Sequence, residues 1–419
     1  MESTLPSQAI KNWKRPFFTI WTGQAFSILG SQLVQFALIW WLTKTTGSAT
    51  VLAGATLVAL LPQILLGPLT GTLVDRWNRR LTMILADSLI VLATLGLAVL
   101  FALGVVQVWH VYLIMFIRSV GAGFHWPAMS ASTSLMVPKE HLSRVQGVNQ
   151  FLNGGLNIVS APLGALLLSI LPMQGIVAID VITAMIAVGP LLFINIPQPE
   201  RNHQTEDKDG KTSLWQEMKA GWCYVLGWPG LAIIGVMAAL INLILTPAFS
   251  LLPILVIKHF GGQALELGWI ESAFGIGVIA GSALLSVWGG FKSRVLTSLV
   301  GLVGMGIGTL IIGVIPSSAF YMAVGAMCLV GFMHPITNGP LLAVAQAVVA
   351  PDMQGRVFSL INSVSTGMTP LGLAIAGPVA DALGVNIWFI VGGIVTGLMG
   401  LAGFLIPAVV NIEDGRQHQ

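Results

Sequence analysis

Four ionisable residues lie inside long apolar segments of the sequence: Asp87, Arg118, Asp180 and Glu271. A carboxylate whose proton affinity follows its surroundings can take up and release a proton, and a nearby guanidinium can bias that exchange. A helix rise of about 1.5 Å per residue places Arg118 and Asp180 at similar depths of about 9–12 Å in their segments, so they can pair. Glu271 has no obvious cationic partner in the sequence. We therefore assign proton coupling to Asp180, Glu271 and Arg118, with structural hydrogen bonding as the open alternative for the two carboxylates.

The composition indicates that lipid surrounds most of the chain. Of 419 residues, 55% are hydrophobic and 8% are charged, against about 25% charged in soluble domains. The sequence pI is about 9.0, but the basic residues form no concentrated patch, which argues against nucleic-acid binding. Cys223 and Cys328 are the two cysteines and lie far apart, so neither a disulfide framework nor a metal site is expected.

Twelve apolar stretches are long enough to cross a bilayer, which needs about 20 residues per helix. They predict an all-α integral membrane protein of two pseudosymmetric six-helix bundles with a cavity between them. The stretches are 17–42, 50–74, 82–104, 108–133, 146–171, 174–196, 228–256, 266–288, 295–315, 318–345, 357–380 and 386–409.

The distribution of lysine and arginine predicts the orientation. Basic residues favour the cytoplasmic side of a membrane, and all 19 fall on one side except Lys44, Lys258 and Arg118. Both termini are therefore expected in the cytoplasm.

A polar interruption from Pro197 to Gly221 divides the stretches six and six. We predict an N-terminal bundle over 1–196, a cytoplasmic linker over 197–222 and a C-terminal bundle over 223–419. The end of the linker predicts either an amphipathic helix on the membrane surface or an extension of the seventh span. The sequence GFHWP at 123–127 is echoed by GFMHP at 331–335, which supports duplicated halves.

Polar side chains recur every three or four residues in four of the stretches and predict the walls of a substrate cavity. Helix-to-helix hydrogen bonding is the alternative for these stripes, and helix packing is the alternative for the two histidines. The predicted cavity residues are Gln24, Ser27, Ser31, Gln35, His125, Asn149, Asn153, Asn157, Asn242, Thr246, His334, Asn338, Asn362 and Thr366.

The stretch GTLVDRWNRR at 71–80 resembles the signature between helices two and three of the major facilitator superfamily, with Asn78 in place of the usual second glycine. The resemblance implies a latch between helix ends that stabilises one access state on the cytoplasmic side. We assign Asp87 to the inner gate beside it. The latch residues are Gly71, Asp75, Arg76, Arg79 and Arg80.

Two further motifs bear on coupling. Arg118, Gly121 and Gly123 resemble the fourth-helix motif of proton-coupled members of the family, in which the arginine is linked to proton transfer. The fifth-helix antiporter motif is matched poorly, because APLGA at 161–165 keeps the proline and one glycine but lacks the Gly-Pro start. The sequence thus supports membership of the superfamily more than it supports antiport.

The first eighty residues are similar to the bacterial macrolide-efflux branch of the family, which also resembles siderophore exporters; the likeness lies in 12–31 and 41–80. The resemblance implies proton-coupled efflux of an amphiphilic drug such as a macrolide by alternating access, and hence antibiotic resistance. We expect a monomer in the bacterial inner (plasma) membrane, with protons and lipid as its other partners and no cofactor. A siderophore or metabolite exporter, an importer and a non-transporting receptor are the alternatives. A phosphate-binding Gly-x-x-x-x-Gly-Lys motif and a catalytic triad are both missing from the sequence, so we expect no enzyme.

Overall fold

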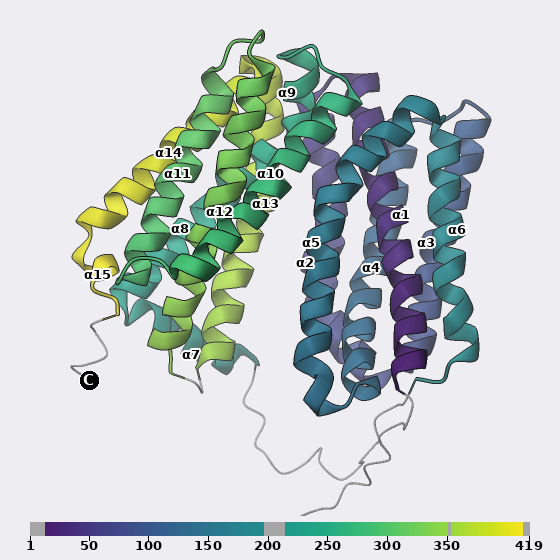
Figure 1. The fold of residues 1–419 in the computed structure, drawn as a ribbon, viewed down its shortest axis with the longest axis horizontal. Coiled ribbons are helices and arrows are strands. Elements are labelled where there is room, and N and C mark those ends of the chain that lie inside the picture. Colours follow the sequence, from purple (N-terminus) through teal and green to yellow (C-terminus); the bar gives the residue numbers. More distant parts are fainter. Residues whose placement is uncertain (1–12, 197–213, 351–352, 414–419) are drawn as a thin grey trace, which may run out of the picture. The chain divides into compact units, whose positions relative to one another are not determined.

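The computed structural model describes residues 13–196, 214–350 and 353–413, and those residues form helices joined by short turns (Figure 1). Each of the twelve predicted stretches overlaps a helix of at least 21 residues in this part of the chain, and the seventh, 228–256, also runs into a second, shorter helix. The long helices are α1 (Lys14–Thr46), α2 (Ala49–Arg76), α3 (Arg79–Ala102), α4 (Val108–Met136), α5 (Lys139–Ile170), α6 (Met173–Phe193), α8 (Pro229–Ser250), α10 (Ala264–Trp288), α11 (Arg294–Val314), α12 (Phe320–Val348), α13 (Gln354–Leu383) and α14 (Val385–Leu405). Three shorter helices are α7 (Leu214–Leu226), α9 (Leu252–Lys258) and α15 (Pro407–Val410). The predicted all-α fold class is confirmed.

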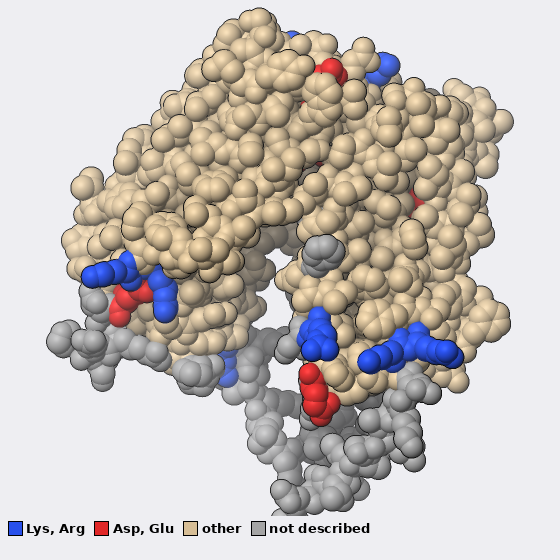
Figure 2. All heavy atoms as spheres, in the orientation of Figure 1, with Lys and Arg blue, Asp and Glu red and all other residues tan. Residues whose placement is uncertain are grey.

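The surfaces of these helices are apolar. Large side chains such as Leu92, Phe193 and Val287 are exposed, as suits a chain whose solvent is hydrocarbon. On the face drawn in Figure 2, most charged atoms of the described residues lie near helix ends, and uncharged atoms cover the helix lengths. Ten of the described helices are long and apolar enough to cross a membrane. α4 and α13 fall outside the ten because polar residues interrupt their apolar runs.

The chain divides into two compact units. Unit 1 comprises residues 1–38 and 58–204, and unit 2 comprises residues 39–57 and 205–419. Within unit 1, α3 packs against α4 and α6. Within unit 2, α11 packs against α12 and α14, α10 against α12, and α8 against α13. The end of α1 and the start of α2 group with the C-terminal helices, and the bounds 1–196, 197–222 and 223–419 stay a prediction.

The predicted linker, 197–222, ends in a separate helix, α7, which continues to Leu226. Gly227 and Trp228 separate it from α8. Pro229 occupies the first turn of α8, where a backbone N–H has no acceptor within the helix and its absence in proline therefore costs no hydrogen bond. α7 packs against α13, and the Tyr224 hydroxyl accepts a hydrogen bond from the backbone N–H of Ala350 at 3.1 Å. α7 is therefore not an extension of the seventh span.

A carboxylate from α13 holds the first turn of α2. Asp381 accepts hydrogen bonds from the backbone N–H groups of Ala49 (2.7 Å) and Thr50 (2.9 Å) and from the Ser48 hydroxyl (2.8 Å). The Ser48 oxygen accepts in turn from the N–H of Val51 at 3.3 Å. The first amides of a helix have no partner within the helix, so these contacts supply acceptors for three of them. They also explain why 39–57 belongs to unit 2.

Gly377 lets α13 approach α2 this closely. A Cβ atom at Gly377 would lie 2.7 Å from the Cα of Thr50 and 3.1 Å from the Cβ of Ala53. Burial opposes ionisation of Asp381, but the hydrogen bonds from Thr50, Ala49 and Ser48 outweigh it and lower the pKa of this carboxyl, near the C-terminal end of α13, to about 2.

Asp381→Ala is expected to lower the thermal stability of the purified chain at pH 7, because loss of a helix-capping oxygen costs about 1 kcal/mol. A carboxyl whose pKa is lower in the folded than in the unfolded chain stabilises the fold at pH values above its unfolded-state pKa. It loses that contribution as the pH falls through its folded-state pKa. The difference in unfolding temperature between wild type and Asp381→Ala should therefore hold from pH 7 to about pH 4 and shrink toward pH 2. Ser48→Ala removes one of the three bonds to Asp381 and the bond from Val51, and it should give a smaller loss because Asp381 keeps both of its backbone N–H donors. Equal unfolding temperatures at pH 7 would contradict the capping role.

Candidate functional site

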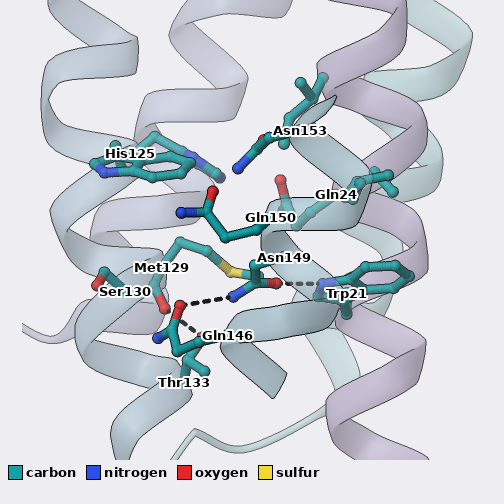
Figure 3. Close-up of a pocket in the computed structure, with 14 residues that line it drawn as sticks. Trp21, Gln24, His125, Met129, Ser130, Thr133, Gln146, Asn149, Gln150 and Asn153 are labelled. Atoms are coloured by element: carbon teal, nitrogen blue, oxygen red, sulfur yellow. Dashed lines mark hydrogen bonds between the residues drawn. The ribbon is translucent and has the colours of Figure 1, made fainter. Parts of the chain in front are cut away.

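A cavity of about 510 Å³ in unit 1, called here the unit 1 cavity, is lined by residues of α1 to α5. Its volume lies within the range of about 300–1,000 Å³ typical of small-molecule sites. An adjoining cavity of about 160 Å³ shares part of the lining and is drawn in Figure 3. The residues common to both are Gln24, Ile28, His125, Trp126 and Asn153.

The structure places the predicted stripe of α1 along this cavity. Gln24, Ser27, Ser31 and Gln35 all line it, because residues three and four apart share one face of a helix.

The α5 stripe faces the adjoining cavity through Asn149 and Asn153. Asn149 accepts a hydrogen bond from the indole N–H of Trp21 at 2.7 Å, and its amide lies 3.5 Å from Gln146 (Figure 3). The side chain of Asn157 lies outside the described part of the structure.

Arg118 of α4 and Asp180 of α6 form a buried ion pair. Their similar depths in the predicted segments had indicated that they could pair. The relative exposures of their side chains are 9% and 1%. The Arg118 guanidinium also donates to the Thr94 hydroxyl and, at 3.4 Å, to the backbone carbonyl of Ser31. The Ser31 hydroxyl donates to the Oδ1 atom of Asp180 at 3.0 Å. The Thr94 hydroxyl lies 3.3 Å from Oδ2, the carboxylate oxygen that contacts Arg118. Such multiple partners are what make a buried ion pair tolerable.

Gly30 allows α1 to reach this pair. A Cβ atom there would lie 2.2 Å from the Thr183 hydroxyl oxygen and 3.1 Å from the Cα of Asp180. Small residues let membrane helices approach closely, and here the approach brings Ser31 within hydrogen-bond distance of Asp180.

A second polar pair joins Asp87 of α3 to His125 of α4. The Nε2 atom of His125 lies 3.4 Å from one carboxylate oxygen of Asp87, and the amide of Gln24 donates to the other at 3.2 Å. All three side chains line the unit 1 cavity. The role of Asp87 at the inner gate stays a prediction; its contacts are with two of the predicted cavity residues.

The latch residues are described only in part. For Gly71, Asp75 and Arg76 the structure describes the backbone of α2 alone. Arg79 is buried. Arg80 donates to the backbone carbonyls of Leu191 and Leu192 at the end of α6 and to the side-chain oxygen of Asn195. Its contacts thus fasten the start of α3 to the end of α6 within unit 1.

In unit 2, Asn242 and Asn338 line a cavity of about 100 Å³, which Thr246, Asn362 and Thr366 do not line. The amides of Asn242 and Asn338 donate to the carbonyl oxygens four residues earlier in their own helices.

The remaining two candidates of unit 2 have few polar contacts. His334 packs edge-on against Phe274, with ring centroids 5.8 Å apart. Glu271 is partly buried on α10 and has no hydrogen bond or ion pair with another residue that the structure describes. Within the described ranges, no group of three or more His, Cys, Asp or Glu side chains is arranged to hold a metal ion.

Several polar residues of the site were missed by the sequence analysis. Thr94 follows Asp87 by seven residues, two helical turns, so its position on the same face was readable from the spacing. Gln32 and Gln63 line the unit 1 cavity, and Gln146 and Gln150 line the adjoining one. Gln63 is a lone polar residue in an apolar run, which gives no periodic signal.

The comparisons with known proteins agree on the class of protein. The family model of the Major Facilitator Superfamily matches residues 20–372 and 231–417. Macrolide efflux protein A of Streptococcus pyogenes is 36% identical over 382 residues, which cover 91% of this chain and 93% of that protein. Macrolide efflux protein A of Enterococcus faecalis is 34% identical over 78% of this chain and 100% of its own length. A crystal structure of a bacterial homologue of the iron transporter ferroportin has a TM-score of 0.71 at 14% identity and covers 93% of this chain and 98% of that chain.

Removing one partner of the Arg118–Asp180 pair is expected to destabilise the chain, because it leaves a buried charge without a counter-charge. In buried pairs of this kind the loss is about 3–5 kcal/mol. Arg118→Met and Asp180→Leu should each lower the unfolding temperature in detergent, and the double variant should recover part of the loss. Losses that simply add in the double variant would contradict the pairing.

Proposed function

This chain belongs to the major facilitator superfamily, and from that premise we propose that it exports an amphiphilic small molecule, such as a macrolide, in exchange for protons. The family is one of multi-pass membrane transporters and not of enzymes. The observation that carries the proposal is the unit 1 cavity, in which the polar stripe of α1 meets the Asp87–His125 pair and the guanidinium of Arg118, which is paired with Asp180.

The lining of the cavity suits an amphiphilic molecule. Amides from Gln24, Gln35 and Asn153 offer hydrogen bonds, while Ile28 and Trp126 offer apolar surface. Drug-sized ligands are usually held by apolar surface with a few polar groups that fix their orientation.

Direction and substrate class are supported by the related chains. Two macrolide efflux proteins of bacteria match this chain at 36% and 34% identity over most of their length. We assign this chain to the bacterial plasma membrane with both termini in the cytoplasm, because the basic residues of its loops gather on one side.

Proton coupling is assigned to Asp180, with Arg118 as the group that biases its charge, and to Glu271 in unit 2. Protonation of Asp180 removes its attraction to Arg118, so the contacts that join α4, α6, α3 and α1 around the pair weaken. A change in access state that separates or hydrates the pair alters its proton affinity in turn. Glu271 has no counter-charge among the described residues, so its ionised form depends on water reaching it.

Asp180→Asn and Glu271→Gln should each abolish uphill efflux under a pH gradient while largely sparing substrate exchange at equilibrium. The assay uses proteoliposomes that hold the full chain, with a radiolabelled macrolide, a cationic dye and a siderophore tested in parallel. Glu266→Gln is the matched control, because Glu266 lies on the same helix as Glu271 but caps its first turn, accepting from the backbone N–H of Gln263. Normal uphill efflux in both test variants would show that neither carboxylate carries the proton. Loss of both activities together with loss of folding would show a structural role.

A further inference from the structure

Four carboxamide side chains of α5 line the adjoining cavity, at spacings of three and four residues that place them on one face of the helix. They are Gln146, Asn149, Gln150 and Asn153. A carboxamide both donates and accepts hydrogen bonds, as a hydroxyl does, so a row of carboxamides complements a ligand with several hydroxyls. We propose that the adjoining cavity binds one uncharged sugar unit of a glycosylated amphiphile, whose apolar part lies in the unit 1 cavity. The inference deepens the proposed function and rests on it.

The carboxamides of this face differ in their partners. Asn149 accepts a hydrogen bond from the indole N–H of Trp21 at 2.7 Å, and its own amide lies 3.5 Å from the side-chain oxygen of Gln146. Gln150 and Asn153 make no hydrogen bond with another residue that the structure describes. Figure 3 shows both of their side chains extending from α5 toward α4. Their donors and acceptors are therefore available to a ligand.

The charge of the adjoining cavity suits a neutral ligand. The polar side chains that line it but not the unit 1 cavity are, among the described residues, hydroxyls, carboxamides and an indole. Asp87 and Arg118 line the unit 1 cavity instead, and His125 borders both. Without a permanent charge in the lining, a phosphate or carboxylate group would lose its hydration for no counter-charge. A sugar, which is hydroxylated but uncharged, meets no such cost.

Two tryptophans supply the apolar part of the adjoining cavity, Trp21 of α1 and Trp126 of α4. A pyranose ring carries hydroxyls at its rim and C–H groups on its faces, and an indole offers a broad apolar face for the latter. The hydrogen bond to Asn149 holds the Trp21 ring in place, and Trp126 is 60% exposed. Carboxamides beside aromatic faces match the two kinds of surface that a sugar presents.

The volume fits one sugar ring. At about 10–15 Å³ for each water-sized group, the cavity of about 160 Å³ holds roughly 11–16 such groups, against about twelve non-hydrogen atoms in a hexose. The adjoining cavity shares Gln24, Ile28 and Trp126 with the unit 1 cavity, so a molecule whose sugar fills it continues into the larger space. An amphiphile with such a sugar should therefore bind more tightly than the same amphiphile without it.

Erythromycin is the probe, because it carries a neutral sugar on an amphiphilic ring. Its descladinosyl derivative lacks that sugar but keeps the ring and the amino sugar, so the charge of the two ligands is matched. Binding of labelled erythromycin, and its displacement by each ligand, are measured on the full-length chain in lipid nanodiscs. The nanodiscs are prepared with a detergent that has no sugar headgroup, because a maltoside would compete. Wild type should bind erythromycin at least tenfold more tightly than the descladinosyl derivative.

Two matched variants locate the sugar. Gln150 lines the adjoining cavity and not the unit 1 cavity, while Gln35 lines the unit 1 cavity and not the adjoining one. Gln150→Met should weaken erythromycin binding by about two- to tenfold, the range for one hydrogen bond, and leave the affinity for the descladinosyl derivative unchanged. Gln35→Met should change both affinities by the same factor. Equal effects of Gln150→Met on the two ligands would contradict the sugar site.

The outcomes separate this inference from the proposed function. Equal affinities of the wild type for the two ligands, in a chain that pumps erythromycin uphill, would overturn the sugar site and leave the export standing. Sugar-selective binding without uphill efflux in proteoliposomes would refute the export and leave the sugar site standing. A lack of erythromycin binding would overturn the sugar site, while uphill efflux of the dye and the siderophore would still test the export.

Discussion

An ionised side chain in the hydrocarbon core of a membrane must meet an opposite charge, a set of hydrogen bonds or water, and unit 1 is arranged around this constraint. Arg118 reaches Asp180 on another helix, and the hydroxyls of Ser31 and Thr94 complete the shell of that carboxylate. The close approach of α1 at Gly30 follows from the same need, because Ser31 must come within hydrogen-bond distance. Four helices thus meet at one ion pair.

The two pairs of unit 1 differ in what holds their carboxylates. Asp180 has a permanent cation, Arg118, and the hydroxyls of Ser31 and Thr94 as partners, an arrangement that responds mainly to movement of the helices. Asp87 has an imidazole and one amide. Arg118 lines the same cavity as Asp87 and His125, and Asp180 lies close enough to Asp87 to act on it electrostatically. Protonation of one carboxylate therefore changes the electrostatic potential at the other. Such reciprocity between sites is the thermodynamic basis of coupling.

Much of this arrangement could be predicted from the sequence. Runs of about 20 apolar residues located the helices, and counting residues from the helix ends allowed Arg118 and Asp180 to pair. The depth of Asp87 in its segment led to the prediction of a role at the inner gate, and that role stays a prediction. Depth along one helix does not reveal which neighbour faces the side chain, and Gln24 and His125 are its neighbours in the fold. The grouping of 39–57 with unit 2 was also hidden, since it rests on Asp381, 332 residues beyond Ala49.

The central claim is that a proton gradient alone can drive this chain to move an amphiphilic molecule against its concentration. The most direct measurement places the wild-type chain as the sole protein in liposomes, holds the membrane potential at zero with valinomycin and equal potassium, and imposes a pH gradient. The account predicts that a labelled macrolide present at equal concentration on both sides accumulates on the acidic side, and that a protonophore abolishes the accumulation. Equal concentrations that persist under the gradient, in liposomes that do exchange labelled for unlabelled macrolide, would contradict it.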